Sequence, residues 1–271
     1  MTRVLNAVTL FGAGTQGSRL AYMWSRLGRP VYLVDRTPAQ LNLALATVER
    51  LRASNPPSEP GQVISLTTDE LDKALHNSWL AIECVPEDLD CKRPVMEELD
   101  RRSDPETIIA SNSSSYFISE ICKGLSLRTN DRFVNLHSFW PPETQAIEIM
   151  GSSQTRADII PLLMKETQDH GFQPFHVRKS STGYTFNRYL ANHVVWDSAI
   201  HTNHETLLLL EEGIATPEVD NIYKAMDIAG LDEHYAKDWI GIPNEPRKVL
   251  REMIERGDLG VKSGNGFFHY T

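Results

Sequence analysis

The chain has 271 residues, with 41% hydrophobic and 23% charged residues, values typical of a globular protein large enough for two domains. Its formal net charge of −9 argues against nucleic acid or an anionic membrane surface as a partner. No apolar run approaches the length of a transmembrane helix, and the first predicted strand begins too early for a cleaved signal peptide. The three cysteines have neither disulfide-framework nor zinc-ligand spacing, so we expect reduced thiols and a cytoplasmic protein.

The most informative pattern lies near the N-terminus. Val8–Phe11 is predicted to be a buried strand, G-x-G-x-x-G spacing follows it, and an amphipathic helix then begins. In this arrangement the glycines make a tight turn, let the backbone approach a pyrophosphate and allow close packing of helix on strand. The N-terminus of the helix adds free N–H groups and the positive end of its dipole. We therefore predict that a dinucleotide is bound by Gly12, Ala13, Gly14, Thr15, Gln16 and Gly17.

A second predicted strand, Val31–Asp35, ends in a carboxylate that can accept hydrogen bonds from a ribose diol. Asp35 follows Gly12 by 35 − 12 = 23 residues, near the roughly 20 expected of a dinucleotide site. The carboxylate would repel a 2′-phosphate, which favours NAD over NADP, whereas the neighbouring cation Arg36 weighs the other way. The alternative interpretation is a glycine-rich turn without a ligand, but the order strand, glycines, helix, strand and acid favours a cofactor site.

Strand-like and helix-like segments alternate through the first two-thirds of the chain. Helices are predicted at Pro38–Leu51, Thr67–His76, Lys92–Arg101, Ile118–Leu125 and Arg156–His170. Strands are predicted at Val63–Leu66, Trp79–Cys84, Thr107–Ala110, Phe133–Leu136, Ala146–Met150 and Gln173–Val177. The alternation predicts an α/β fold of Rossmann type, with a doubly wound, mainly parallel sheet.

From about Ser180 the strand pattern stops, and only helices are predicted, at Asn187–Leu210, Glu218–Ile228 and Glu245–Arg256. We therefore expect a Rossmann domain over residues 1–180 and a smaller all-helical domain over residues 181–271. The first of these helices carries several potential metal ligands, namely His193, His201, His204 and Glu205. No second ligand cluster accompanies them, which favours a solvated helix face over a metal site.

Polar residues follow the predicted strands at the sheet edge where doubly wound folds bind ligands. They are Gly12, Asp35, Glu83, Glu87, Ser111–Ser113 and His137. His137 is expected to leave its strand and enter a loop with Pro141 and Pro142. Glu148 alternates with Ile147 and Ile149 in an apolar strand, so it needs a partner, and His137 is the nearest candidate.

A histidine backed by a carboxylate suits proton abstraction from an alcohol, because the carboxylate fixes the tautomer and stabilises the imidazolium that forms. A single histidine after a strand is more often a surface residue or a satisfied core residue. Ser111–Ser115 likewise has a simpler interpretation, a turn with a helix cap.

Several segments together resemble the 3-hydroxyacyl-CoA dehydrogenase family over most of the chain. The matching segments are the glycine turn, Glu83–Glu87, Ser111–Ser115, His137 with its proline turn and Glu148, Gly183–Arg188, and Gly264–Tyr270. The resemblance implies hydride transfer from C3 of a 3-hydroxyacyl substrate to NAD, with His137 as general base and Glu148 orienting it. It also implies that Ser111 and Asn187 bind the C3 oxygen, that Glu87 and Lys92 lie at the cofactor, and that the helical domain forms a homodimer.

The sequence departs from the family pattern at three places. Trp140 stands where the family has an active-site asparagine, and the segment from Arg52 to Gln62 lacks the lysines that help hold coenzyme A phosphates. The helical half also differs, since the helix from Asn187 is longer by roughly nine residues and a following Gly-Pro-Phe segment is missing. Glu83–Glu87 and the double proline are similar to the branch with L-gulonate 3-dehydrogenase and lambda-crystallin. A dehydrogenase of free 3-hydroxy acids and a crystallin-like protein that only binds NAD therefore stay open as alternatives.

Overall fold

The computed structural model describes residues 6–181, 184, 185, 255 and 256. The chain divides into two units, Met1–His176 and Val177–Thr271, and the first unit contains the strands and helices named below. The predicted C-terminal helices lie outside the described residues, apart from Glu255 and Arg256, which are helical. The predicted boundary near residue 180, the all-helical second domain and the placement of Asn187 therefore stay predictions.

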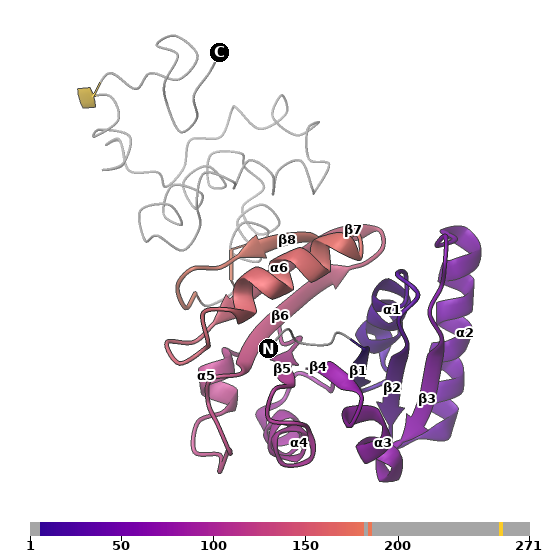
Figure 1. Cartoon of the computed structure of the whole chain (residues 1–271), viewed down its shortest axis with the longest axis horizontal. Coiled ribbons are helices and arrows are strands. Elements are labelled where there is room, and N and C mark those ends of the chain that lie inside the picture. Colours follow the sequence, from indigo (N-terminus) through magenta and orange to yellow (C-terminus); the bar gives the residue numbers. More distant parts are fainter. Residues whose placement is uncertain (1–5, 182–183, 186–254, 257–271) are drawn as a thin grey trace, which may run out of the picture. The chain divides into compact units, whose positions relative to one another are not determined.

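One eight-stranded sheet forms the centre of the first unit, in the order β3-β2-β1-β4-β5-β6-β7-β8 (Figure 1). The strands are β1 (Ala7–Phe11), β2 (Val31–Asp35), β3 (Val63–Thr67), β4 (Ser78–Glu83), β5 (Ile108–Ser111), β6 (Phe133–Trp140), β7 (Thr144–Gly151) and β8 (Gln173–His176). Strands β1 to β6 run parallel, β7 is antiparallel to β6, and β8 is parallel to β7. The prediction of a mainly parallel, doubly wound sheet is confirmed, and its strand order reverses beside β1, where such folds bind ligands.

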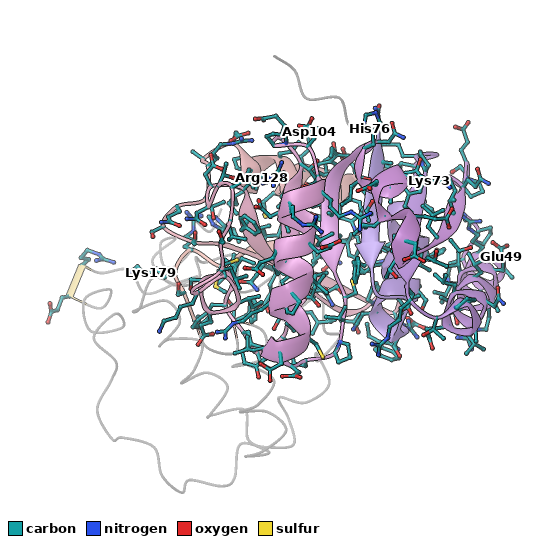
Figure 2. The ribbon with its side chains drawn as sticks, turned by 90° about the horizontal axis from the view of Figure 1, so that it is seen from below. Glu49, Lys73, His76, Asp104, Arg128 and Lys179 are labelled. Carbon is teal, nitrogen blue, oxygen red and sulfur yellow. The ribbon has the colours of Figure 1, made fainter. Side chains whose placement is uncertain are left out.

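Helices cover both faces of this sheet. They are α1 (Thr15–Trp24), α2 (Pro38–Ser54), η1 (Thr68–Glu70), α3 (Leu71–Leu75), α4 (Leu89–Arg102), α5 (Ile118–Ile121) and α6 (Ile159–Asp169). Side chains of α1, α2 and α6 share one buried apolar cluster with one face of the sheet, and those of α3, α4 and α5 share a second cluster with the other face. The charged side chains of Glu49, Lys73 and Asp104 lie on the outside (Figure 2).

Within residues 6–181 the predicted helices and strands are present, and some of their ends differ from the prediction. Helix α4 begins before the predicted Lys92 because the Asp88 side chain caps it by accepting from the Asp90 N–H. Helix α1 ends at Trp24, which leaves Leu27 beyond it and 43% exposed. Among the described residues, no helix is both long and apolar enough to cross a membrane. All three cysteines are free thiols.

The prediction that His137 enters a loop is wrong, because β6 continues through Trp140. Antiparallel pairing with β7 extends the strand, and this pairing sets His137 directly opposite Glu148. The Leu136–Trp140 segment has no continuous apolar run, so the sequence pattern alone gave no sign of the longer strand.

Candidate active site

The three glycines in the turn after β1 differ: one leaves space for a ligand beside it, and the other two do not. Gly12 has φ +111°, and a Cβ there would lie 2.6 Å from the Cys84 carbonyl oxygen. A Cβ at Gly17 would lie 1.9 Å from the Gly12 carbonyl oxygen, whereas a Cβ at Gly14 would have no neighbour within 4 Å. Gly12 and Gly17 are thus required by the fold, and the open space before α1 at Gly14 fits the approach of a pyrophosphate.

Asp35 ends β2 and also holds the glycine turn in shape. Its Oδ2 accepts a hydrogen bond from the Ala13 N–H at 2.9 Å, and its Oδ1 accepts one from the Thr37 N–H at 2.9 Å. Gln40 donates from Nε2 to the Ala13 carbonyl oxygen at 2.8 Å. Each carboxylate oxygen has more than one acceptor position, so the same group can also receive a ribose hydroxyl. Arg36 is exposed beside it.

His137 and Glu148 form a cross-strand pair on β6 and β7. Their Nδ1 and Oε2 atoms lie 3.2 Å apart, His137 is 5% exposed and Glu148 is fully buried. Ile147 and Ile149 on either side of the glutamate belong to the apolar cluster on the other face of the sheet, as the alternation predicted. A buried carboxylate beside Nδ1 favours the tautomer that carries its proton on Nδ1, which places the lone pair on Nε2.

A cavity of about 210 Å³ joins the glycine turn to this pair. Among the residues that line it are Gln16, Glu87, Lys92, Asn112, Ser114 and His137. Gln16 also donates from Nε2 to the Phe139 carbonyl oxygen at 2.6 Å, which ties the first turn of α1 to β6. The structure therefore brings residues predicted for the cofactor and the predicted general base to one cavity.

Ser111 lies beneath this cavity and is fully buried. Its Oγ donates to Glu83 Oε2 at 2.6 Å, because β4 and β5 pair these two residues in register. The members of the serine-rich segment that line the cavity are Asn112 and Ser114. The sequence pattern does not distinguish the serines, because only the turn after β5 decides which of them face the cavity.

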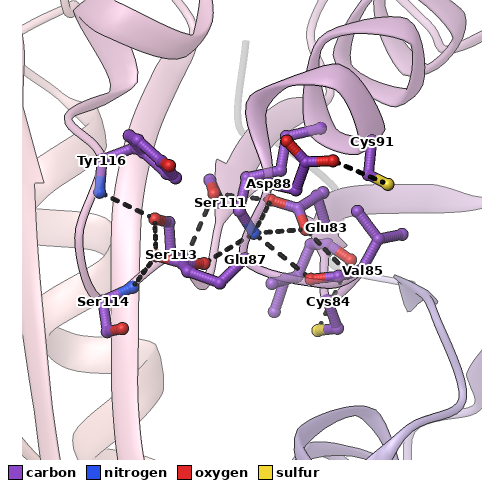
Figure 3. Close-up of polar contacts among 12 residues, drawn as sticks. Glu83, Cys84, Val85, Glu87, Asp88, Cys91, Ser111, Ser113, Ser114 and Tyr116 are labelled. Atoms are coloured by element: carbon purple, nitrogen blue, oxygen red, sulfur yellow. Dashed lines mark hydrogen bonds and ion pairs between the residues drawn. The ribbon is translucent and has the colours of Figure 1, made fainter.

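Glu87 and Lys92, both predicted at the cofactor, belong to a polar network in the cavity wall (Figure 3). Lys92 Nζ lies 3.0 Å from Glu83 Oε1 and 3.0 Å from Glu87 Oε2. Glu87 Oε1 accepts from Ser113 Oγ at 2.6 Å and from the N–H groups of Ser114 and Ser115. Glu87 therefore fixes the course of the serine segment.

The network keeps Lys92 and Glu87 charged. Burial alone would lower the pKa of Lys92, but Glu83 and Glu87 outweigh burial and hold that pKa above its ordinary value. Burial alone would raise the pKa of Glu87, but the hydrogen bond from Ser113 and the charge of Lys92 hold it below its ordinary value. Burial, reinforced by the charge of Glu83, raises the pKa of the Cys84 thiol, which also lines the cavity, so that thiol stays neutral.

Ser138 and Asn112 form a further contact that sequence reasoning missed. The Asn112 Oδ1 accepts from the Ser138 N–H at 2.9 Å and from Ser138 Oγ at 2.8 Å. Because both donors approach Oδ1, the assignment of oxygen and nitrogen in this side chain follows from its contacts, and Nδ2 is the remaining donor. No sequence signal reveals the pair, since strand pairing alone brings residues 26 positions apart together.

Metal ligands are not grouped in this unit: among the described residues, no three His, Cys, Asp or Glu side chains could hold a metal ion together. The predicted absence of a metal site stays a prediction for the chain as a whole, since His193, His201, His204 and Glu205 lie outside those residues.

Comparisons with known proteins identify the family of this chain. Residues 7–180 match the sequence model of the 3-hydroxyacyl-CoA dehydrogenase NAD-binding domain. The chain is 25% identical over 300 residues to the mitochondrial hydroxyacyl-coenzyme A dehydrogenase of Homo sapiens, an alignment that covers 98% of this chain and 92% of that protein.

Solved structures share the fold. The 3-hydroxyacyl-CoA dehydrogenase of Archaeoglobus fulgidus superimposes with a TM-score of 0.67 at 22% identity, covering 98% of this chain and 92% of the other. The (S)-3-hydroxybutyryl-CoA dehydrogenase of Ralstonia eutropha gives a TM-score of 0.62 at 24% identity, covering 99% and 100%. The family model spans well over half of the chain, so this protein belongs to the 3-hydroxyacyl-CoA dehydrogenase family and carries its NAD-binding domain.

Proposed function

We propose that this NAD-dependent oxidoreductase oxidises the C3 hydroxyl of a 3-hydroxyacyl-CoA thioester to a ketone, with His137 as general base. The observation that carries the proposal is the His137–Glu148 pair, at 3.2 Å, in the wall of a cavity that also contains Gln16 of the glycine turn. A base and a dinucleotide site at one cavity are what the oxidation of an alcohol requires. When bound, NAD+ supplies the hydride acceptor.

His137 takes the hydroxyl proton on Nε2 as the C3 carbon loses its hydride. Glu148 accepts the hydrogen bond of Nδ1–H, stabilises the imidazolium that forms and prevents rotation of the ring. The fully buried carboxylate acts strongly because little solvent screens it. We assign Asn112 and Ser114, which line the cavity, as further donors to an oxygen atom there, while Ser111 stays a proposed contact of the C3 oxygen. Asn187 stays a proposed second donor to that oxygen.

Cofactor binding is assigned to Gly12–Gly17 for the pyrophosphate and to Asp35 for the adenosine ribose. Two observations support this assignment: none of the described residues lies within 4 Å of the Gly14 Cβ position, and Asp35 lies at the end of β2. Arg36 is then a surface cation beside the ribose, and the Asp35 carboxylate makes NAD the preferred dinucleotide.

His137→Gln tests the catalytic assignment. The variant should lower kcat by about 10²- to 10⁴-fold, since it removes the general base, while the Kd for NAD+ should change less than about threefold. The measurements are NADH formation with 3-hydroxybutyryl-CoA at the nicotinamide absorbance and calorimetric titration with NAD+. Equal loss of turnover and of NAD+ binding would show that His137 has a structural role and would overturn the assignment.

A free 3-hydroxy acid is the second candidate substrate, and the contacts of Arg52 favour it. Arg52 is the cation of the segment that the family resemblance assigns to coenzyme A phosphates. Its guanidinium contacts Glu49 at 2.9 Å, Ser25 Oγ at 3.1 Å and the Gly61 carbonyl oxygen. These contacts within the fold compete with binding of a coenzyme A phosphate. Parallel assays with 3-hydroxybutyryl-CoA and with free 3-hydroxybutyrate and L-gulonate decide between the candidates. Turnover of free acids alone would exclude the thioester.

We further propose a homodimer that acts in the cytoplasm on a small-molecule substrate. Three free thiols support a reducing compartment, although the human relative is mitochondrial by name. Sedimentation of the full chain at two protein concentrations tests the dimer, and a monomer at both would contradict it.

A further inference from the structure

A buried ion network lies in the wall of the cavity and has no part in the proton transfer described above. We call Glu83, Glu87 and Lys92 the buried ion network (Figure 3). Its ammonium group contacts both carboxylates, and Glu83 and Lys92 are 0% and 1% exposed. With both carboxylates ionised and the ammonium protonated, the network carries a net charge of −1 by addition of these groups.

Hydrogen-bond donors surround the Glu83 carboxylate. Its Oε1 accepts from Lys92 Nζ at 3.0 Å and from the Val85 N–H at 2.7 Å. Its Oε2 accepts from Lys92 Nζ at 3.2 Å and from Ser111 Oγ at 2.6 Å. Each of these partners is a donor, so the contacts hold the Glu83 carboxylate beside the ammonium group of Lys92.

Glu87 and Lys92 also line the cavity together with His137. The nicotinamide ring must reach His137 for the proposed reaction, so this inference rests on the proposed function. NAD+ and NADH differ in the charge of that ring, which is cationic when oxidised and neutral when reduced. A fixed charge in the cavity wall therefore changes the affinity for NAD+ relative to the affinity for NADH.

We propose that the buried ion network selects the oxidation state of the cofactor, its net negative charge strengthening the binding of NAD+ relative to NADH. Glu83 is a positioning residue in this scheme, because it holds the ammonium group of Lys92 and contributes the charge that leaves the sum negative. The network should also make bound NAD+ a weaker oxidant, since its negative charge stabilises the cationic ring.

The expected size of the effect follows from Coulomb's law. Two unit charges about 8 Å apart, a separation we take only as a scale, change an affinity ratio by about thirtyfold in an effective dielectric of about 20. Partial screening by solvent at the cavity mouth reduces this to about fivefold. The proposal therefore predicts a change in the ratio of Kd(NAD+) to Kd(NADH) of about five- to thirtyfold for each unit of charge.

Four variants of the full chain test the proposal by direct binding, with both Kd values measured by calorimetry. Glu83→Gln and Glu87→Gln each remove a negative charge, so both should raise the ratio of Kd(NAD+) to Kd(NADH). Lys92→Met removes the positive charge and should lower the ratio. Ser111→Ala disturbs the same network without changing its charge, and should leave the ratio within about twofold of the wild type.

The ratio separates an electrostatic role from a structural one, because damage to the site weakens both dinucleotides together. Opposite shifts for the glutamine and methionine variants would support the proposal. Unchanged ratios, or shifts of the same sign, would overturn it while leaving the proposed function intact. Wild-type protein that binds neither dinucleotide would overturn both. Glu87 is partly exposed, so Glu87→Gln decides the question if Glu83→Gln fails to fold.

Discussion

The glycine turn and the β6–β7 hairpin both contribute to one cavity, through Gln16 and His137, but different features of the polypeptide set their geometry. In the turn, the main chain determines the geometry, because Gly12 and Gly17 lie too close to other main-chain atoms to carry a side chain. In the hairpin, the backbone around His137 and Glu148 is a regular antiparallel ladder, and the chemistry depends on which side chains face each other. His137 and Glu148 could be exchanged for other residues of similar size without altering that ladder.

This difference separates folding from chemistry within one site. Changes in the turn should affect stability and cofactor binding, since the main chain itself forms the surface for the ligand. Changes in the hairpin should remove turnover and leave the fold intact. The predictions below test this separation, beginning with the substitution of largest expected effect.

Gly17→Ala should be the most damaging single change in the turn. Its Cβ would lie 1.9 Å from the Gly12 carbonyl oxygen, so α1 would have to move away from β1. We expect a loss of stability of about 3 kcal/mol or more and a fall in the thermal midpoint of about 6–12 °C. Differential scanning calorimetry of the purified variant gives both values.

Gly14→Ala is the matched control. Gly14 has φ −71°, which any residue adopts, and its Cβ would meet nothing within 4 Å. The thermal midpoint should therefore stay within about 2 °C of the wild type, while the Kd for NAD+ rises because the methyl group fills the space for the pyrophosphate. Equal destabilisation by both substitutions would refute the distinction between the two glycines.

Glu148→Gln tests the hairpin. Glutamine keeps the shape of the side chain but can present an N–H group to Nδ1, which favours the wrong tautomer of His137. We expect kcat to fall about a hundredfold or more with little change in thermal midpoint or in NAD+ affinity. Steady-state kinetics and calorimetry measure these quantities.

Glu143→Gln is the comparison for that variant. Glu143 lies between β6 and β7 but its side chain is 57% exposed and contacts Arg19 rather than the histidine. It should keep kcat within about twofold of the wild type. A large loss of kcat in Glu143→Gln would mean that carboxylates anywhere in the hairpin matter, and would remove the special role of the cross-strand pair.

The two regions also differ in how well sequence predicts them. The glycine turn is local: strand, glycines, helix, strand and Asp35 follow one another, so spacing alone predicts the arrangement that the structure shows. Alternation of Ile147, Glu148 and Ile149 likewise predicts which face the glutamate occupies. These features need only a strand or helix period and standard turn chemistry.

Features that depend on pairing between distant segments could not be predicted in this way. The full length of β6 depends on β7, and the burial of Ser111 depends on Glu83 in the neighbouring strand. The contact of Ser138 with Asn112 depends on where the turn after β5 lies. Each joins segments whose register is set by the whole sheet, and no local pattern encodes that register.

Asp35→Ala should have a smaller effect than Gly17→Ala and Glu148→Gln, because it acts at the edge of the turn. It removes the acceptor of the Ala13 N–H as well as the partner of the ribose. We expect the Kd for NAD+ to rise about tenfold and the preference for NAD+ over NADP+ to decrease. Asp35→Asn, which keeps the shape and removes the charge, should relax the preference with less loss of NAD+ affinity. Unchanged preference in both variants would contradict the role of the carboxylate.

Apart from the control variants, Ser138→Ala should give the smallest effect. It tests whether a side-chain hydrogen bond matters where a backbone hydrogen bond reaches the same atom. The variant removes the hydroxyl donor at 2.8 Å from Asn112 Oδ1 but keeps the Ser138 N–H at 2.9 Å. The amide of Asn112 should then rotate more freely, and kcat/KM should fall by about two- to fivefold. Asn112→Ala should cost more, because it removes the donor in the cavity altogether.

The double variant Ser138→Ala with Asn112→Ala completes the cycle. If the hydroxyl acts only by orienting the amide, the second substitution adds nothing once Asn112 is gone, and the coupling equals the whole effect of Ser138→Ala. Additive losses in kcat/KM would instead place the Ser138 hydroxyl in direct contact with the substrate or the cofactor. The hairpin would then contribute to binding as the glycine turn does. Binding and turnover would not be divided cleanly between the turn and the hairpin.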